Sequence, residues 1–408
     1  MTQQAVYLDN NATTPVAPEC VAPVLECLCE SWGNPSSKHA VGEAAKSRVS
    51  EARASVAKLL NATPAEIVFT AGGTEASHLA IHGALAARPG RSHIVTSAVE
   101  HPATLALLAQ LETQGVRVTR LPVDADGGLD LAALERAITP DTALVSLMWA
   151  NNETGVLFPV ADAARIAQSK GALFHTDAVQ AAGKIPLDLA QVPVDLLSLS
   201  GHKFHAPKGV GALFVRKGLA LQPMLFGHQE RRRRGGTENV PAIAGMGLAC
   251  ELAAGELEAR AAAMAALRDR LESGVLMRIP GARINGGTAP RVANTSSVHF
   301  GELEAEAILD KLDKAGICAS SGAACTAGGS APSHVLAAMG LSDAQARATI
   351  RFSLSRYTTE AEIDHVLDAL ASIHKRMTAE AHSQPKGNTM KIMIRKDAQG
   401  ILSAYVPK

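Results

Sequence analysis

Apolar and polar positions form a regular alternation of helical and strand patterns from about residue 42 to residue 220. Residues 42–60 and 74–87 carry apolar positions at helical spacing. Seven further runs predict strands: "EIVFTAGG", "SHIVTSAVEH", "RVTRLPV", "TALVSLMWANNETG", "ALFHTDAVQ", "VDLLSLSGHK" and "GVGALFVR". Several are continuous apolar runs, which is typical of strands buried on both faces of a sheet. The order predicts an α/β fold with a mostly parallel sheet, in which the last two runs could form an antiparallel step.

A second pattern follows toward the C-terminus. Residues 238–277 are rich in alanine and helical in spacing, and alternating helix and strand patterns then continue to about residue 377. They predict a smaller α+β domain. Residues 380–388 are polar and typical of a linker, and the last 20 residues show strand-like alternation on either side of a "DAQG" turn.

Composition and charge exclude several classes of function. The chain has 408 residues, of which 47% are apolar, and equal numbers of basic and acidic residues, 39 each. A nucleic-acid-binding protein would usually show a basic excess, so we expect the single basic run, Arg231–Arg234, to be a solvated loop or an anion contact. The N-terminus has no secretory pattern, and no apolar run approaches the ~18 residues of a membrane span. We therefore expect a cytoplasmic protein that binds neither membrane nor nucleic acid.

The six cysteines predict free thiols, because the chain is long and lacks the features of a secreted protein. No CxxC pair supports a structural zinc site. Cys20, Cys27, Cys29 and Cys250 lie in helical patterns, and Cys318 lies in a strand pattern; we expect all five to be packed. Cys325 is different, because it lies in the glycine-rich stretch "SSGAACTAGGS", which favours conformational freedom.

Two motifs place polar residues where predicted strands end. In open α/β sheets, ligands bind beyond the carboxyl ends of the strands. In "FTAGGTEA", Thr74 would begin a helix whose free N–H groups can hold a phosphate, although an ordinary helix cap uses the same residues. In "LFHTDAVQ", Asp177 ends an apolar strand and Gln180 lies one turn later. A buried carboxylate needs a cation such as a protonated pyridine nitrogen, or else serves as a cap or in a salt bridge.

Two more motifs add basic groups. "LSLSGHKFHAPKGVG" puts Ser200, His202 and Lys203 directly after a strand. Desolvation lowers the pKa of such a lysine and makes Lys203 a Schiff-base candidate, whereas Lys208 suits a solvated turn. "SAVEHPA" puts His101 at another strand end, where it could stack on a planar ring and move protons, or be a satisfied core histidine.

The order of these motifs resembles that of the cysteine desulfurases, most closely the nitrogen-fixation (NifS-like) type, which are fold type I pyridoxal-phosphate enzymes. The matching stretches extend from about residue 5 to residue 375: "VYLDNNATTPV", "GNPSSKH", "EIVFTAGGTEA", "VEHPA", "MWANNETG", "HTDAVQAAGK", "SGHKFHAPKGVG", "HQERRRRGGTEN", "SSGAACTAG" and "IRFSLSRYTTEAEID". The resemblance implies a large domain of residues 16–258 with a seven-stranded sheet, a small domain of residues 1–15 and 259–379, and a linker and extension at 380–408.

The resemblance also implies a cofactor site for pyridoxal 5'-phosphate. Its residues would be Gly73, Thr74, His101, Asn152, Asp177, Gln180, Ser200, His202, Lys203 and Thr237, the last reaching in from the other subunit of a homodimer. Lys203 would hold the cofactor covalently and move the substrate's α-proton. Asp177 would pair with the pyridine nitrogen, Gln180 would bond the phenolic oxygen, and His101 would stack on the ring. The phosphate would lie at Gly73, Thr74, Ser200, His202 and Thr237.

The implied reaction converts L-cysteine to L-alanine. Asn152 and Arg351 would hold the substrate carboxylate, and Cys325 would receive the sulfur as a persulfide. By the same resemblance, an iron–sulfur scaffold protein that serves nitrogenase maturation would accept that sulfur, so that Cys325 could also contact a transferred cluster. The alternatives are a selenocysteine lyase, an aminotransferase, a general housekeeping desulfurase, or a sulfur-relay scaffold with an inactive cofactor site.

Two features depart from the family pattern. His78 stands where family members commonly carry Asn, and Ala76 and Ser77 before it also differ; we expect activity to survive, while hydrogen bonding near the cofactor could change locally. The last ~20 residues resemble the start of a small nitrogen-fixation protein of the T type, and an ordinary C-terminal extension is the alternative reading.

Overall fold

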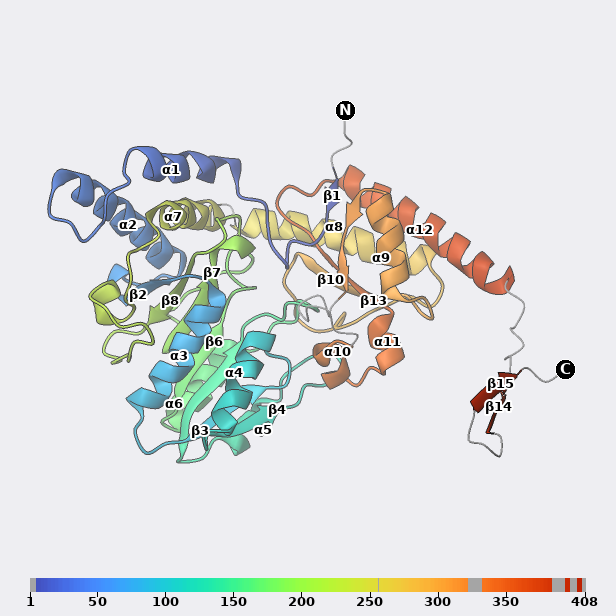
Figure 1. Cartoon of the computed structure of the whole chain (residues 1–408), viewed down its shortest axis with the longest axis horizontal. Coiled ribbons are helices and arrows are strands. Elements are labelled where there is room, and N and C mark those ends of the chain that lie inside the picture. The colour runs from blue at the N-terminus through green and yellow to red at the C-terminus, as the bar shows by residue number, and fades with distance from the viewer. Residues whose placement is uncertain (1–4, 256, 322–331, 384–392, 397–401, 406–408) are drawn as a thin grey trace.

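The computed structural model describes residues 5–255, 257–321, 332–383, 393–396 and 402–405 (Figure 1). A seven-stranded sheet forms the larger part, in the order β2-β8-β7-β6-β5-β3-β4. Its strands are β2 (Ile67–Thr70), β3 (His93–Ser97), β4 (Arg117–Leu121), β5 (Thr142–Met148), β6 (Leu173–Asp177), β7 (Leu196–Ser200) and β8 (Gly211–Val215). Only β8 is antiparallel to its neighbours, β7 and β2. The predicted α/β fold, the mostly parallel sheet and the antiparallel step are therefore confirmed.

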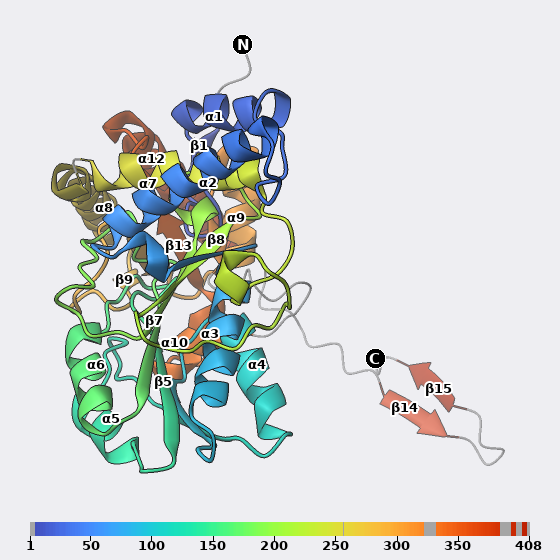
Figure 2. The same cartoon turned by 90° about the vertical axis from the view of Figure 1, so that its left-hand side faces the viewer.

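Helices cover both faces of this sheet (Figure 2). They are α1 (Pro18–Cys29), α2 (Ala40–Leu59), α3 (Gly73–Ala87), α4 (Pro102–Glu112), α5 (Leu131–Ala137), α6 (Val160–Ser169) and α7 (Val240–Ala254), with short 3₁₀ turns η1 (Pro64–Glu66), η2 (Gly201–Lys203) and η3 (Glu230–Arg232). Alternate strand residues enter two separate cores: Val68 packs with α3 and α4, whereas its neighbour Phe69 packs with α2 and α7. Successive side chains of a strand point to opposite faces of the sheet, and both faces are apolar here. These strands therefore appear in the sequence as continuous apolar runs.

A second, smaller sheet has the order β12-β13-β10-β9 and its own apolar core. Its elements are α8 (Leu257–Arg278), β9 (Arg283–Ile284), β10 (Thr295–His299), α9 (Ala305–Lys314), β11 (Ile317–Cys318), β12 (Ser320–Ser321), α10 (His334–Ala338), α11 (Asp343–Arg347), β13 (Thr349–Ser353) and α12 (Glu360–Ser383). The N-terminal strand β1 (Val6–Tyr7) pairs with β11. The chain therefore starts beside this sheet before entering the larger one.

The C-terminal segment contributes a hairpin of its own. β14 (Met393–Lys396) and β15 (Leu402–Tyr405) pair antiparallel, as the alternation predicted. In the described part of the chain, no single helix combines the length and apolar character of a membrane span. The pair α7 and α8 meets that test only when both are taken together across a 77° bend.

The described cysteines correct one expectation. Cys20, Cys27 and Cys250 are buried, as predicted, but Cys29 is exposed at the end of α1, and Cys318 is only partly buried. The helical spacing predicted correctly that Cys29 lies in a helix. It could not predict that this face of α1 is exposed to solvent. Burial raises the pKa of the Cys20 thiol to about 11. A thiol held protonated in this way is a poor nucleophile.

Candidate active site

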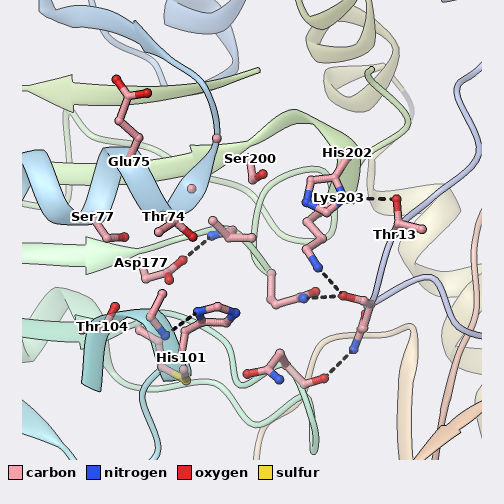
Figure 3. A pocket seen from close by; sticks show the side chains of 18 of the residues that line it. Thr13, Thr74, Glu75, Ser77, His101, Thr104, Asp177, Ser200, His202 and Lys203 are labelled. Atoms are coloured by element: carbon pink, nitrogen blue, oxygen red, sulfur yellow. Dashed lines mark hydrogen bonds between the residues drawn. The ribbon is translucent and has the colours of Figure 1, made fainter. Parts of the chain in front are cut away.

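A cavity of about 830 Å³ lies at the carboxyl ends of the central strands (Figure 3). The residues predicted from the sequence that line it are Gly73, Thr74, His101, Asn152, Asp177, Gln180, Ser200, His202, Lys203 and Arg351. Apart from Arg351, they lie at or just after the ends of strands that are far apart in the sequence. Parallel strands end at one edge of a sheet, so the turns that follow them meet there.

The start of α3 forms one wall of the cavity. The first backbone bond at this end runs from the N–H of Ala76 to the carbonyl of Gly72, so the N–H groups of residues 73–75 have no acceptor within the helix. A Cβ at Gly73 would lie 2.8 Å from a methyl of Val179 and 3.3 Å from Cβ of Ser200, so only glycine fits. Backbone donors, the helix dipole and the Ser200 hydroxyl together form an anion cradle.

Lys203 is held at the end of η2, directly after β7. Its Nζ donates to the carbonyl oxygens of Asn11 at 2.6 Å and Ala12 at 2.7 Å. Next to it, the His202 ring bonds Thr13 Oγ1 through Nδ1 at 3.1 Å. The N-terminal segment therefore orients both residues of the Ser-Gly-His-Lys turn.

The charges of Asp177 and His101 influence each other's pKa. Asp177 ends β6, and its Oδ1 accepts the N–H of Val179 at 2.9 Å. Burial raises the pKa of Asp177, while that N–H, His101 and Lys203 act in the opposite direction. A buried carboxylate of this kind is stabilised when a cation comes beside it.

His101 is the N-cap of α4, where its Nδ1 accepts the N–H of Ala103 at 3.2 Å. Burial lowers the pKa of His101, so the neutral ring carries its proton on Nε2. The alternative considered for His101 was a core histidine with both ring nitrogens hydrogen-bonded, and His175 is such a residue. Its two ring nitrogens bond Ser146 and Ser198, and burial lowers its pKa to about 3.

Arg351 reaches the cavity from β13 of the smaller sheet. One of its terminal nitrogens donates to the carbonyl of Asn152 at 3.0 Å and the other to Asp9 Oδ1 at 2.7 Å. Its Nε is buried and has no hydrogen-bond partner among the residues that the structure describes. A buried, unpaired guanidinium donor favours an anionic ligand at this end of the cavity.

The motifs quoted above gave Asn11 no role, although it joins both sheets to the site. Its side-chain nitrogen donates to the Asn152 carbonyl and to Thr295 Oγ1, at 3.1 and 2.8 Å. Its backbone carbonyl accepts from Gln180 and Lys203. The two adjacent asparagines after β1 were a possible signal, but an exposed turn would give the same pattern.

His78 lines the cavity, and its Nε2 lies 3.1 Å from the carbonyl oxygen of Ala103. Ala103 thus bonds His101 through its backbone N–H and His78 through its carbonyl oxygen. The neighbouring Ser77 also lines the cavity, and its buried hydroxyl has no hydrogen-bond partner in the described part of the chain. The triplet thus gives this wall one histidine bonded to Ala103 and one serine hydroxyl that faces no acceptor among the described residues.

Two predicted residues are not among the described residues that line this cavity. Thr237 is exposed and absent from its lining. Cys325 lies outside the described residues. The flanks of its segment nevertheless end near the cavity: Ser320 pairs with Arg351 across β12 and β13, and the Ser333 hydroxyl donates to the buried carboxylate of Glu153.

The arginine run contacts its own chain. Arg231 donates to the carbonyls of Pro64 and Ala65, and Arg233 also donates to Ala65. Arg234 pairs with Glu75 at 2.8 Å. These arginines hold the segment before Thr237 against η1 and the start of α3.

The sequence matches the aminotransferase class-V family model over residues 6–366. The chain is a member of this family. It is 52% identical over 375 residues to the cysteine desulfurase of Trichormus azollae, covering 92% of this chain and 94% of that protein. It is 51% identical over 364 residues to the cysteine desulfurase NifS of Azotobacter vinelandii, covering 89% and 90%.

A solved structure titled as a NIFS-like protein gives a TM-score of 0.85 at 38% identity, covering 91% of this chain and all of that one. The resemblance to NifS-like proteins, and with it the predicted fold type, is confirmed. In this class-V chain, most of the residues that the order of motifs predicted line one cavity.

Glu100 should make the stability of this class-V protein depend on pH. Burial raises its pKa to about 8 from 4.5, although Ser97 and Met148 donate to it. Between these values the unfolded chain has released this proton while the folded chain keeps it, so rising pH destabilises the fold. Glu100→Gln keeps the accepting oxygen and removes this effect.

We expect Glu100→Gln to match wild type near pH 4 and to be more stable at pH 8, by on the order of 3 kcal/mol. Urea unfolding of both proteins at the two pH values measures this. The same difference at both pH values would contradict the assignment.

Proposed function

We propose that this protein is a cysteine desulfurase that converts L-cysteine to L-alanine and moves the sulfur to Cys325. One observation carries the proposal: a single cavity holds a strand-end lysine, a strand-end aspartate, a histidine and an anion cradle, together with an arginine Nε that has no partner among the described residues. The names of its relatives support the same reaction.

The residues present fit pyridoxal 5'-phosphate. The cradle at the start of α3, which a Cβ at Gly73 would fill, suits a phosphate; the orphaned Ser77 hydroxyl offers a further donor. Asp177 suits a protonated ring nitrogen, and His101 suits the ring face. Bound there, the cofactor would withdraw electrons from the substrate's α-carbon.

The chain's own groups would then act on L-cysteine. Arg351 and Asn152 would hold its carboxylate, and the Lys203 amine would carry the α-proton. In the overall reaction the substrate's C–S bond breaks, an S–S bond forms at Cys325, and the carbon that lost sulfur gains a proton. Sulfur is oxidised and carbon reduced, so no external reductant is required.

The other thiols support Cys325 as the acceptor. Burial raises the pKa of Cys20, Cys27, Cys250 and Cys318. Protonated thiols attack sulfur poorly. Cys29 is exposed, but it lies at the end of α1 and not among the residues that line the cavity.

Several further assignments belong to this proposal. A homodimer would let Thr237 complete the phosphate site of a second copy; its exposure agrees with that role. The sulfur acceptor would be an iron–sulfur scaffold protein, with a transferred cluster contacting Cys325, and the NifS relative favours a role in nitrogen fixation. We also propose a cytoplasmic location and the domain division at residues 16–258, 1–15 with 259–379, and 380–408.

Mass spectrometry after incubation with L-cysteine tests the proposal. We expect one added sulfur on the Cys325 peptide and release of alanine. Cys325→Ala should lose both the added sulfur and at least about 10²-fold of alanine formation, because the acceptor thiol is gone. Cys29→Ala, which removes an exposed thiol, is the control and should behave as wild type. Full alanine formation by Cys325→Ala would refute the persulfide reaction.

A further inference from the structure

Lys184 is a buried lysine to which the reaction above gives no role. It is 7% exposed and, among the described residues, forms no ion pair. Its Nζ donates to Gln180 Oε1 at 2.6 Å and to Asn11 Oδ1 at 2.9 Å. Gln180 and Asn11 line the cavity, whereas Lys184 lies behind them.

The surroundings of Lys184 disfavour its charge. Burial lowers the pKa of Lys184 well below its usual value, and the nearby cations Lys203 and Arg351 lower it further. Its amine gives one N–H to each of the two acceptors, Gln180 Oε1 and Asn11 Oδ1. Lys184 therefore acts as a fixed pair of donors.

The hydrogen bond from Lys184 determines the orientation of the Gln180 side-chain amide. Because Lys184 donates to Oε1, the NH₂ group of Gln180 must lie on the other side. One hydrogen of that group bonds the Asn11 carbonyl at 3.0 Å. The second has no acceptor among the described residues, and Gln180 lines the cavity.

The same carbonyl of Asn11 accepts Lys203 Nζ at 2.6 Å. Asn11 Oδ1 accepts Asn294 as well as Lys184, so the side chain of Asn11 is held from two directions. Lys184 thus fixes Gln180 directly and Lys203 through Asn11.

We propose that Lys184 is a positioning residue that orients the Gln180 amide so that its NH₂ group donates to the ring oxygen of the cofactor. This inference rests on the proposed function, because it requires the cofactor in this cavity. Without Lys184, the amide of Gln180 could rotate and present its oxygen to an anionic ring oxygen, which is repulsive.

A double-mutant cycle of Lys184→Met and Gln180→Met tests the proposal. The readouts are the dissociation constant of pyridoxal 5'-phosphate and the pH midpoint of its visible absorption band, both independent of turnover. We expect each single variant to bind the cofactor about tenfold more weakly, because a donor to a charged oxygen is lost. The midpoint should move to higher pH, because this donor stabilises the ring oxygen most after the Lys203–cofactor link has lost its proton.

In the double variant the effect should not exceed that of the larger single change. A purely structural Lys184 would instead give additive losses, and an unchanged midpoint in Lys184→Met would overturn the proposal. Lys217→Met, at an exposed lysine, is the control and should leave both readouts unchanged.

A high-resolution structure of the wild-type holoprotein gives a test that needs no variant. Gln180 should lie with Nε2 toward the ring oxygen and Oε1 on Lys184; the reverse would overturn the inference even if Lys184→Met fails to fold. Failure of the proposed function is distinguishable, because wild-type protein would then show no visible band that depends on Lys203.

Discussion

Lys203→Ala is expected to abolish the visible absorption band of bound pyridoxal 5'-phosphate and to lower kcat/KM for L-cysteine by at least about 10³-fold. The amine is both the covalent attachment point and the group placed to carry the α-proton, and removing such a group alone typically costs 10² to 10⁴ in rate. Lys203 lies at the end of η2, where two carbonyls of the N-terminal segment accept its Nζ. Absorbance spectra and alanine assays measure the change.

Lys217→Ala is the matched control, because it removes an exposed lysine just after β8. It should keep the band and the rate. Retention of the visible band by Lys203→Ala would show that another amine holds the cofactor, and the assignment of Lys203 would be wrong.

Asp177→Asn is expected to lower kcat by about 10² to 10³-fold, as for the loss of one preorganised charge interaction at the reacting centre. Asparagine keeps the oxygen that accepts the Val179 N–H, so the fold should be retained. It has no negative charge, however, and a protonated ring nitrogen would lose its partner. Steady-state rates with cofactor in excess separate this effect from weaker binding.

Asp195→Asn provides the comparison for a partly buried carboxylate outside the site. Asp195 lies just before β7, its Oδ2 accepts the Phe174 N–H at 2.9 Å, and burial raises its pKa as it does that of Asp177. It is absent from the cavity lining. Equal loss of activity in both variants would show that Asp177 acts only on stability.

The strands and the residues at their ends could be predicted from the sequence because both are local features. A strand buried on both faces gives a continuous apolar run, and a polar residue directly after it stands out. Thr74, Asp177 and Lys203 were found in this way. The parallel sheet then brings the ends of such strands to one edge, so their meeting follows from the fold class.

The sequence by itself therefore determined the fold class and the reactive groups that the central sheet presents. The tertiary structure alone decided that Arg351 crosses from the smaller sheet with an unpaired Nε, that Asn11 links Lys203 to Gln180, and that Lys184 stands behind them. These contacts join residues up to 342 positions apart, as in the pair of Arg351 with Asp9. No local pattern records them, because hydrogen bonds between distant segments depend on how the two sheets pack and not on spacing along the chain.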